Sequence, residues 1–256
     1  MLPQQARQAF RAYFLARFPR VALRAYAYGV PAPGPGQIPD VTPPAAALAA
    51  GKRLWATRFP DGHTYAGCFP DGVRGAAARY PRFDAAQGHV QTLEMALNAC
   101  RIRNGRPAYP NRAHGPLVDL AAYCTSLSAG YPIRVRLPTP GAVRAFARGE
   151  RFFWAQRGQR NFSCATCHVQ HAGARLGDAT LTAALGQAAA FPAYQPATAT
   201  WISIIGQYRH CLRRMGAIPP PSHSRLYRDL LLYQMFLNNG LPLAPALTSF
   251  GSHATE

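Results

Sequence analysis

Two cysteines and a histidine stand together in the segment NFSCATCH, residues 161–168. Their spacing, C-x-x-C-H, is typical of covalently attached haem, because the two thiols can add to the haem vinyl groups while the next residue brings an imidazole to the iron. We therefore predict that Cys164 and Cys167 carry the haem thioethers and that His168 is the proximal iron ligand. A zinc site is the other interpretation, but zinc needs two further ligands, and their usual spacing is missing.

The ligand on the opposite face of the iron is not fixed by this motif. The downstream side chains that can bind iron are His171, His210, Cys211, Met215 and Met235. His171 follows His168 by three residues, which is too close for its side chain to reach the opposite face. Ordinary electron-transfer cytochromes use methionine, which raises the reduction potential. Met235, however, lies on an apolar helical face and is typical of core packing.

The elements that must position these side chains are predicted to be helical. Apolar residues recur at three- and four-residue spacing in five stretches, which are 48–58, 90–101, 118–130, 142–158 and 226–240. Cys124 lies inside the third stretch and is predicted to be a buried small hydrophobe. Two Pro- and Gly-rich stretches, 28–50 and 134–143, divide the chain. The predicted units are an N-terminal arm and linker at 1–44, a segment at 45–135 and a segment at 140–256.

The two larger segments repeat the same anchors in the same order. AGKRLW at 50–55 is echoed by RGERFF at 148–153, and LNACRIRNG around Cys100 is echoed by YRHCLRRMG around Cys211. Tyr, Leu, Gly and Pro then recur with identical internal spacing, at 123, 127, 130 and 132 and at 233, 237, 240 and 242. We therefore predict an all-α protein of two tandem cytochrome c-like domains. The first lacks the C-x-x-C-H motif and is expected to be haem-free, whereas the second binds one haem c.

The repeat also relates the cysteines of the two segments. Cys68 stands where the haem anchors are expected in the first copy, and Cys100 stands where Cys211 stands in the second. If an ancestor carried haem in both copies, the first has lost one anchor cysteine and the histidine, which leaves two cysteines that can pair. We predict a Cys68–Cys100 disulfide and Cys211 as the distal iron ligand. A plain cytochrome with His210 or Met215 in that place is the less favoured alternative.

The formal net charge is +18, almost all of it from arginine, because Lys52 is the only lysine. Such a charge could indicate a nucleic-acid binder, but the arginines are scattered and no zinc finger or helix-turn-helix pattern is present. An acidic protein partner or an arginine-biased genome explains the charge equally well, so we expect no nucleic-acid partner. The basic amphipathic arm is predicted to pack on the body or on a partner protein rather than on a membrane surface.

The chain has no run of eighteen apolar residues, which predicts that it has no membrane-spanning helix. Its first twenty residues are arginine-rich and lack the apolar stretch of a secretory signal. Haem thioethers form outside the cytoplasm in bacteria, where disulfides also persist. We therefore expect a periplasmic protein whose export signal has been removed from this chain.

Residues 45–245 resemble SoxA, the larger subunit of the SoxAX cytochromes of bacterial sulfur oxidation. They are similar to the members in which only the C-terminal domain keeps haem. The resemblance rests on motifs taken in order, which are GKRLW, TYAGCFPDG, RYPRFD, TLEMALNACR, SLSAGYPI, QRGQRNFSCATCHVQHAG, ALGQ, FPAY and NNGLPL. Taken together these motifs are far more specific than the C-x-x-C-H spacing alone.

The resemblance implies His and Cys as the axial haem ligands, which correspond to His168 and Cys211, and the family cysteine is often a persulfide. It implies that thiosulfate, or a related sulfur anion, becomes oxidatively joined to a cysteine of a SoxYZ-like carrier protein. Two electrons leave through the single haem c, and a small SoxX-like cytochrome lies alongside. A thiolate ligand lowers the haem potential and also offers a reactive sulfur, so Cys211 is the predicted catalytic residue.

The sequence departs from the family where anion-binding arginines are expected. SoxA typically has arginine immediately after Tyr194 and again four residues before Cys211, and here Gln195 and Gln207 take these places. Glutamine replaces only part of the paired, charged hydrogen bonds that arginine offers to an anion. The family arginine shortly after the cysteine corresponds to Gly216.

Three other arginines, Arg209, Arg213 and Arg214, lie near Cys211 and could compensate in an anion pocket. Arg209 and Arg213 flank Cys211 by two residues on either side. On a helix, however, such neighbours point away from one another. The leading hypothesis is an active sulfur-transferring subunit, because Cys211 is retained. The alternative is a noncatalytic SoxA relative that acts as an electron-transfer or assembly subunit, because the arginines are missing. An extra sulfur on Cys211 that cyanide removes would favour the first hypothesis.

Overall fold

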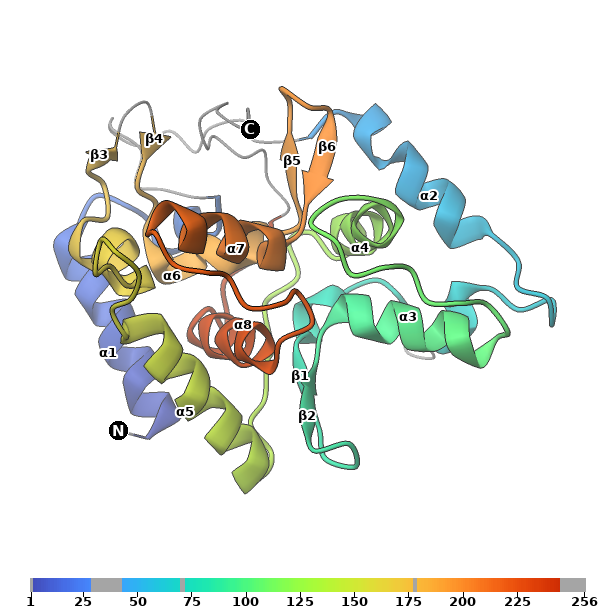
Figure 1. The fold of residues 1–256 in the computed structure, drawn as a ribbon, viewed down its shortest axis with the longest axis horizontal. Coiled ribbons are helices and arrows are strands. Elements are labelled where there is room, and N and C mark those ends of the chain that lie inside the picture. Colours follow the sequence, from blue (N-terminus) through green and yellow to red (C-terminus); the bar gives the residue numbers. More distant parts are fainter. Residues whose placement is uncertain (1, 29–42, 70–71, 177–178, 245–256) are drawn as a thin grey trace.

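The computed structural model describes residues 2–28, 43–69, 72–176 and 179–244. Most of the stretch predicted as a linker, 28–50, lies outside these residues. The protein is mainly helical; in Figure 1 residues 49–126 lie towards the right, whereas residues 3–17 lie on the left beside residues 140–154. Within the described ranges, no helix is both long enough and apolar enough to cross a membrane.

Short helices alternate with two-stranded antiparallel hairpins. The helices are α1 (Pro3–Arg17), α2 (Ala49–Ala56), α3 (Leu93–Arg103), α4 (Pro116–Ser126), α5 (Pro140–Trp154), α6 (Ala184–Gln187), α7 (Ile204–Arg214) and α8 (Arg225–Leu237). The hairpins pair β1 (Arg82–Asp84) with β2 (His89–Gln91), β3 (Arg175–Leu176) with β4 (Ala179–Thr180), and β5 (Ala193–Gln195) with β6 (Thr200–Ile202). All five stretches predicted to be helical contain a helix, which confirms that prediction.

Residues with specific end preferences explain where the helices begin and end. A Thr or Ser precedes α3, α5, α7 and α8, and its side-chain oxygen accepts a backbone N–H from the first turn. Proline lies in the first turn of α1, α4 and α5, where its missing N–H costs no helical hydrogen bond. α8 ends at Leu237, shortly before Gly240, which has a φ of +88° and terminates the helical path.

In each half, the first long helix crosses the last one at a glycine. A Cβ added to Gly51 of α2 would lie 2.1 Å from the carbonyl oxygen of Asp119 on α4. A Cβ added to Gly149 of α5 would lie at the same distance from the carbonyl oxygen of Asp229 on α8. The two glycines are matched positions of the repeat seen in the sequence. A hairpin and a helix, β1-β2-α3 or β5-β6-α7, come between the crossing helices in both halves.

The crossing of α5 and α8 also holds a buried ion pair. The side chain of Asp229 is 1% exposed, and its Oδ2 lies 2.6 Å from Nε of Arg148 and 3.4 Å from Nε of Arg225. Removing either charge from a buried pair leaves the other uncompensated, so this contact ties the two helices together strongly.

The segments that follow α4 and α8, 130–133 and 240–243, pair with each other in antiparallel fashion. Pro132 and Pro242, which are matched positions of the repeat, face each other in this bridge. Four backbone hydrogen bonds of 2.9 Å join the two segments and form two equivalent pairs. In the first pair, the N–H of Ile133 donates to Leu241 and the N–H of Leu243 donates to Tyr131. In the second pair, the N–H of Gly130 donates to Leu243 and the N–H of Gly240 donates to Ile133. Each bond has its counterpart when the two halves are exchanged, so the contact has local twofold symmetry.

The first half contains the predicted disulfide between Cys68 and Cys100, whose Cα atoms are 5.9 Å apart. It links the 3₁₀ turn Tyr65–Cys68 to α3 in the half that has no C-x-x-C-H motif. Cys124 is fully buried in α4, and burial raises the pKa of its thiol. Cys124 is therefore the buried small hydrophobe that the sequence predicted.

We expect Gly51→Ala and Gly149→Ala each to destabilise the protein by about 1–3 kcal/mol, because the added methyl group has no room between the helices. The sign of the change in unfolding free energy is informative, since Gly→Ala at an unconstrained helical site stabilises a protein by up to about 1 kcal/mol. Denaturant unfolding measures the effect. Gly67→Ala is the control, because an added Cβ there meets nothing within 4 Å. Wild-type stability in both crossing variants would contradict the close packing.

Candidate haem site

The C-x-x-C-H segment folds into a short helical turn that Ser163 and Thr166 hold in place. Ser163 Oγ accepts the N–H of Thr166 at 3.0 Å, and Thr166 Oγ1 accepts the N–H of Ser163 at 3.1 Å. This reciprocal pair fixes the entry of the chain into Thr166–Gln170, a turn with π-helical hydrogen bonding. Such turns are frequent at functional sites. Cys167 and His168 both lie on it.

His168 is oriented by the segment that follows the turn. Its Nδ1 lies 2.9 Å from the carbonyl oxygen of Thr182. A carbonyl oxygen can only accept, so Nδ1 carries the proton and Nε2 keeps the lone pair that can bind iron. Burial lowers the pKa of His168, which favours the neutral imidazole that a metal ligand requires. The amide nitrogen of Gln187 lies 3.0 Å from Nδ1 and 3.2 Å from Nε2, so this amide packs against the ring.

The structure brings Cys211 close to both predicted haem anchors. Cys211 is half-buried on α7, and burial raises the pKa of its thiol to about 12. The nearby thiols of Cys164 and Cys167 act on this pKa in the same direction. Gln207, one turn earlier on α7, donates from Nε2 to Sγ of Cys211 at 3.6 Å, which lowers the pKa. Three thiols from two separate elements therefore lie close enough to influence one another's ionisation.

The other predicted candidates for the distal ligand have different surroundings. Met235 is buried in the core on α8, as expected from its apolar helical face. Met215 is buried at the C-terminal end of α7. His210 is half-buried, and its pKa is lowered by burial and then by the two arginines that end α7. His171 is exposed at the end of the π turn.

The arginines near Cys211 divide between two sides of α7. Burial raises the pKa of Tyr227 on α8, and the charges of Arg209 and Arg213 lower it, which places these two guanidinium groups towards Tyr227. Arg214 is the arginine whose charge lowers the thiol pKa of Cys211. Arg214 was one of the three arginines expected to compensate near Cys211, and it shares the helix face of Cys211 because it follows by three residues.

The two glutamines that replace family arginines are also placed differently. Gln207 is buried and contacts Cys211. Gln195 ends β5 and pairs with Thr200, at the turn of the β5–β6 hairpin. Of these two glutamines, Gln207 is the one in contact with Cys211.

Arg157 is a residue that sequence reasoning missed. Burial raises the pKa of the Cys164 thiol to about 11, and the charge and side-chain hydrogen bond of Arg157 lower it. The guanidinium carbon of Arg157 lies 3.9 Å from the centroid of the Phe152 ring, and its Nη2 donates to the Phe152 carbonyl. Arg157 lies in a loop seven residues before Cys164, and that spacing gave no signal of a contact.

These side chains fit a covalently bound haem. The neutral imidazole has its Nδ1 proton engaged, two thiols follow the attachment spacing, and a third thiol offers a sulfur ligand. The described residues contain no group of three or more His, Cys, Asp or Glu side chains that could by itself hold a metal ion.

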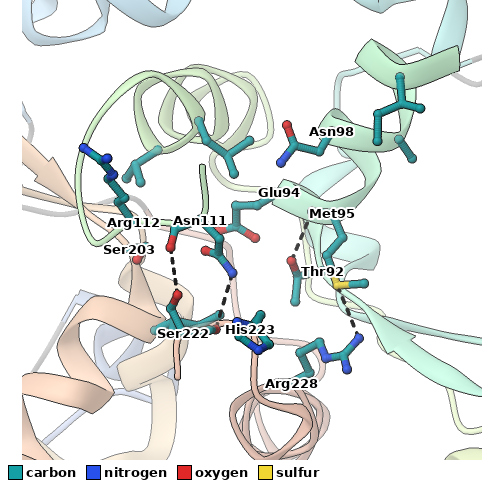
Figure 2. Close-up of a pocket in the computed structure, with 15 residues that line it drawn as sticks. Thr92, Glu94, Met95, Asn98, Asn111, Arg112, Ser203, Ser222, His223 and Arg228 are labelled. Carbon is teal, nitrogen blue, oxygen red and sulfur yellow. Dashed lines mark hydrogen bonds between the residues drawn. The ribbon is translucent and has the colours of Figure 1, made fainter. Parts of the chain in front are cut away.

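A separate pocket of about 300 Å³ lies between the two halves of the chain, as Figure 2 shows. Asn111 and Ser222 join its walls through hydrogen bonds of 2.8 and 3.3 Å, and Arg228 Nη1 contacts Sδ of Met95 at 3.8 Å. The described lining includes none of the predicted haem-site residues, so this pocket is distinct from the candidate site.

Sequence comparison relates the chain to sulfur-oxidising cytochromes. The family model "SoxA/TsdA, cytochrome c domain" matches residues 50–133, the half without the C-x-x-C-H motif. The L-cysteine S-thiosulfotransferase subunit SoxA of Allochromatium vinosum is 36% identical over 249 residues, which is 94% of this chain and 88% of that protein. The protein of the same name from Chlorobaculum tepidum is 35% identical over 242 residues, covering 91% and 83% respectively.

Structural comparison supports the same fold. A chain in the crystal structure of SoxXA from P. pantotrophus superposes with a TM-score of 0.71 and 24% sequence identity. The match covers 79% of this chain and 77% of that one.

In the haem-free chain, we expect Cys211 to react slowly with iodoacetamide at about pH 8. Its raised pKa leaves roughly a thousandfold less thiolate there than a thiol with the usual value of 9.0. The labelled fraction should rise only as the pH approaches this pKa, because the folded chain holds the proton more tightly. Peptide mass spectrometry measures the labelling.

The control for this experiment is the same chain unfolded in urea, in which Cys211 should react as an ordinary thiol. Gln207→Leu should slow labelling of the folded chain further, because it removes the hydrogen bond that lowers the pKa. Equal labelling rates in folded and unfolded chains would contradict the assigned environment of Cys211.

Proposed function

The chain belongs to the SoxA family, and from this membership we propose that it couples thiosulfate oxidatively to a cysteine of a carrier protein. The observation that carries the proposal is the position of Cys211. Its thiol lies close enough to Cys164 and Cys167 for them to raise its pKa, although it comes from a helix separate from the C-x-x-C-H turn. A sulfur held at the haem attachment site is the feature that distinguishes this chemistry from plain electron transfer.

The cofactor is one covalently bound haem c, as in the SoxA cytochromes to which the chain is related. Cys164 and Cys167 would hold it through thioethers, His168 would bind the iron on one face, and Cys211 would bind it on the other. When bound, the haem supplies an electron acceptor whose potential is lowered by a thiolate ligand. The carbonyl of Thr182 keeps the proton of His168 at Nδ1 throughout.

The proposed reaction balances as a two-electron oxidation. A sulfur–sulfur bond forms between the outer sulfur of thiosulfate and the carrier cysteine, and the carrier thiol gives up its proton. The two electrons would pass one at a time through the haem to an external cytochrome acceptor, which is the oxidant. Gln207 contributes a hydrogen bond to Cys211, and Arg214 contributes a positive charge. Both favour the thiolate, and a cation beside the sulfur also attracts the thiosulfate anion.

We propose that the described fold consists of two tandem cytochrome c-like domains, 45–135 and 140–256, preceded by an arm and linker at 1–44. The matched glycine crossings support this division, since both added Cβ atoms would lie 2.1 Å from a carbonyl oxygen. The symmetric pairing of 130–133 with 240–243 supports it as well. In this arrangement the disulfide of the first domain takes the place of haem anchors.

The proposed partners follow from the family and the charge. A small SoxX-like cytochrome would bind alongside, because the similar crystal structure is titled SoxXA. A SoxYZ-like carrier would present the acceptor cysteine, and a net charge of +18 suits an acidic protein surface. The expected compartment is the periplasm, where covalent haem and disulfides are both stable.

A noncatalytic SoxA relative is the second candidate function, and one observation favours it. The side chain in contact with Cys211 is the neutral Gln207 rather than an arginine. Without a guanidinium at that point, an anion would have fewer charged donors beside the sulfur. The chain would then carry electrons or organise the complex without transferring sulfur.

The proposed function is tested with the haem-loaded chain, a SoxX-like partner, a SoxYZ-like carrier and thiosulfate. We expect thiosulfate to appear on the carrier cysteine, as measured by intact mass. Cys211→Met should reduce this transfer at least about a hundredfold, because it removes the reactive sulfur, and should raise the haem potential.

Met215→Leu is the matched control and should leave the haem spectrum and the transfer unchanged. A spectrum that changes in Met215→Leu but not in Cys211→Met would establish the plain cytochrome alternative. Absence of transfer by a chain with intact His/Cys ligation would establish the noncatalytic alternative.

We further expect Gln207→Arg to lower the KM for thiosulfate by about tenfold, since a charged hydrogen bond to an anion is worth about 1.5–3 kcal/mol. The guanidinium would occupy the place where the amide now contacts Cys211. Initial transfer rates over a range of thiosulfate concentrations measure the change. Arg213→Met is the comparison and should have a small effect, because that arginine lies towards Tyr227. An unchanged KM in Gln207→Arg would show that thiosulfate does not bind beside this residue.

A further inference from the structure

We propose that the N-terminal arm, residues 2–28, is a positioning element for His168 that braces the histidine-bearing turn through Tyr13 and Arg17. The inference rests on the proposed haem ligation by His168. It concerns a part of the chain that lies far from the C-x-x-C-H motif in sequence. The family model matches none of this arm, since it begins at residue 50.

The arm precedes the first half in sequence but packs on the second half. In Figure 1, α1 lies beside α5 on the left of the molecule, away from α2 and α4. The rings of Phe10 on α1 and Phe153 on α5 are 6.3 Å apart between centroids, and Phe14 is fully buried. Arg11 Nη2 donates to the carbonyl of Asn239 after α8 at 2.7 Å. The arm is therefore part of the haem-binding half.

The first brace acts at the end of the turn that carries His168. Arg17 Nη2 donates to the carbonyl oxygens of Gln170 at 3.0 Å and of Ala172 at 3.3 Å. Tyr13 donates its hydroxyl to the carbonyl of Val169 at 3.3 Å and accepts from Arg17 Nη1 at 3.0 Å. Carbonyl groups at the end of a helical turn lack partners within it, and a cation there also complements their aligned dipoles. Two side chains of α1 thus hold the turn from its C-terminal end.

The second brace acts on the segment that orients the imidazole. The 3₁₀ turn Leu23–Tyr28 of the arm approaches α6 so closely that a Cβ on Gly186 would lie 2.0 Å from the Tyr26 carbonyl oxygen. Gln187, the next residue, places its amide against the His168 ring. The Tyr26 hydroxyl donates to the Phe14 carbonyl at 2.9 Å, which joins the two parts of the arm.

His168 therefore lies between two elements that the same arm holds. Covalent attachment at Cys164 and Cys167 keeps the haem on the chain, but it does not orient the imidazole. The arm fixes the turn relative to Thr182 and Gln187, so the orientation in which His168 would present Nε2 to a bound haem depends on it. Partners that orient a ligating histidine typically change metal affinity by about 10–100-fold when they are lost.

The test uses the haem-loaded, full-length chain with Arg17→Met and Tyr13→Phe. We expect acid to convert the low-spin visible spectrum to one that lacks the histidine ligand at a higher pH than in the wild type, by about one unit for a tenfold weaker ligand. The His168→Ala variant supplies the reference spectrum for that state. Amides of 166–172 should exchange hydrogen about tenfold faster in Arg17→Met.

Arg11→Met is the matched control, because Arg11 anchors the same helix by a hydrogen bond that does not involve the turn. It should lower thermal stability as Arg17→Met does, yet leave the acid transition and the exchange of 166–172 as in the wild type. Arg17→Lys should recover part of the shift, since an ammonium can donate to the same carbonyls.

Equal acid transitions in Arg17→Met, Arg11→Met and the wild type would overturn the inference while leaving the proposed function intact. An unchanged spectrum in His168→Ala would instead overturn the proposed ligation itself. If Arg17→Met does not fold, Tyr13→Phe decides, because it removes only a hydroxyl group. A wild-type acid transition in Tyr13→Phe would then count against the inference.

Discussion

The contact between Gly149 of α5 and the Asp229 backbone of α8 sets the frame for the haem-binding half. It lets two helix backbones meet, and the buried carboxylate of Asp229 is held by Arg148 at the same crossing. α5 ends shortly before the C-x-x-C-H turn, so the crossing decides where that turn starts. α8 also supports α7, since Tyr208 donates to Gln234. One helix therefore determines the positions of both elements whose cysteines meet at the candidate site.

Much of this arrangement could be predicted from the sequence, because its signals are local or repeated. Periodicity predicted five of the described helices, and the repeat predicted the Cys68–Cys100 pairing. Strands of two or three residues are too short to show alternation, so the hairpins were not foreseen. Arg214 was named as a neighbour of Cys211 but left out of the predicted anion pocket, because sequence proximity to Cys211 was weighed above helical rotation. The docking of α1 could not be predicted, since nothing in its amphipathic pattern says which half receives its apolar face.

The excess of arginine has a structural use within the described chain. Both described ion pairs share one carboxylate, Asp229, and ten acidic residues cannot pair with twenty-eight cationic ones. Guanidinium groups instead donate to backbone carbonyls and lie over aromatic rings, as Arg101 does with the Pro107 carbonyl and the Tyr109 ring. Arg17 and Arg157 act in similar ways near the candidate site. A planar, multi-donor cation suits these neutral partners, which a lysine would satisfy less well.

The twofold pairing of 130–133 with 240–243 bears on how such a chain could have arisen. Each hydrogen bond in this contact has an equivalent one when the two halves are exchanged. Such a contact is called isologous, and it is the kind that joins identical subunits in a symmetric dimer. A single-domain ancestor with this segment could therefore have associated with its own copy before the gene was duplicated and fused. Fusion makes that association intramolecular and independent of protein concentration. If that ancestor carried haem, one copy would then have been free to exchange its haem for a disulfide, because the other copy kept the cofactor and the shared contact kept the pair together.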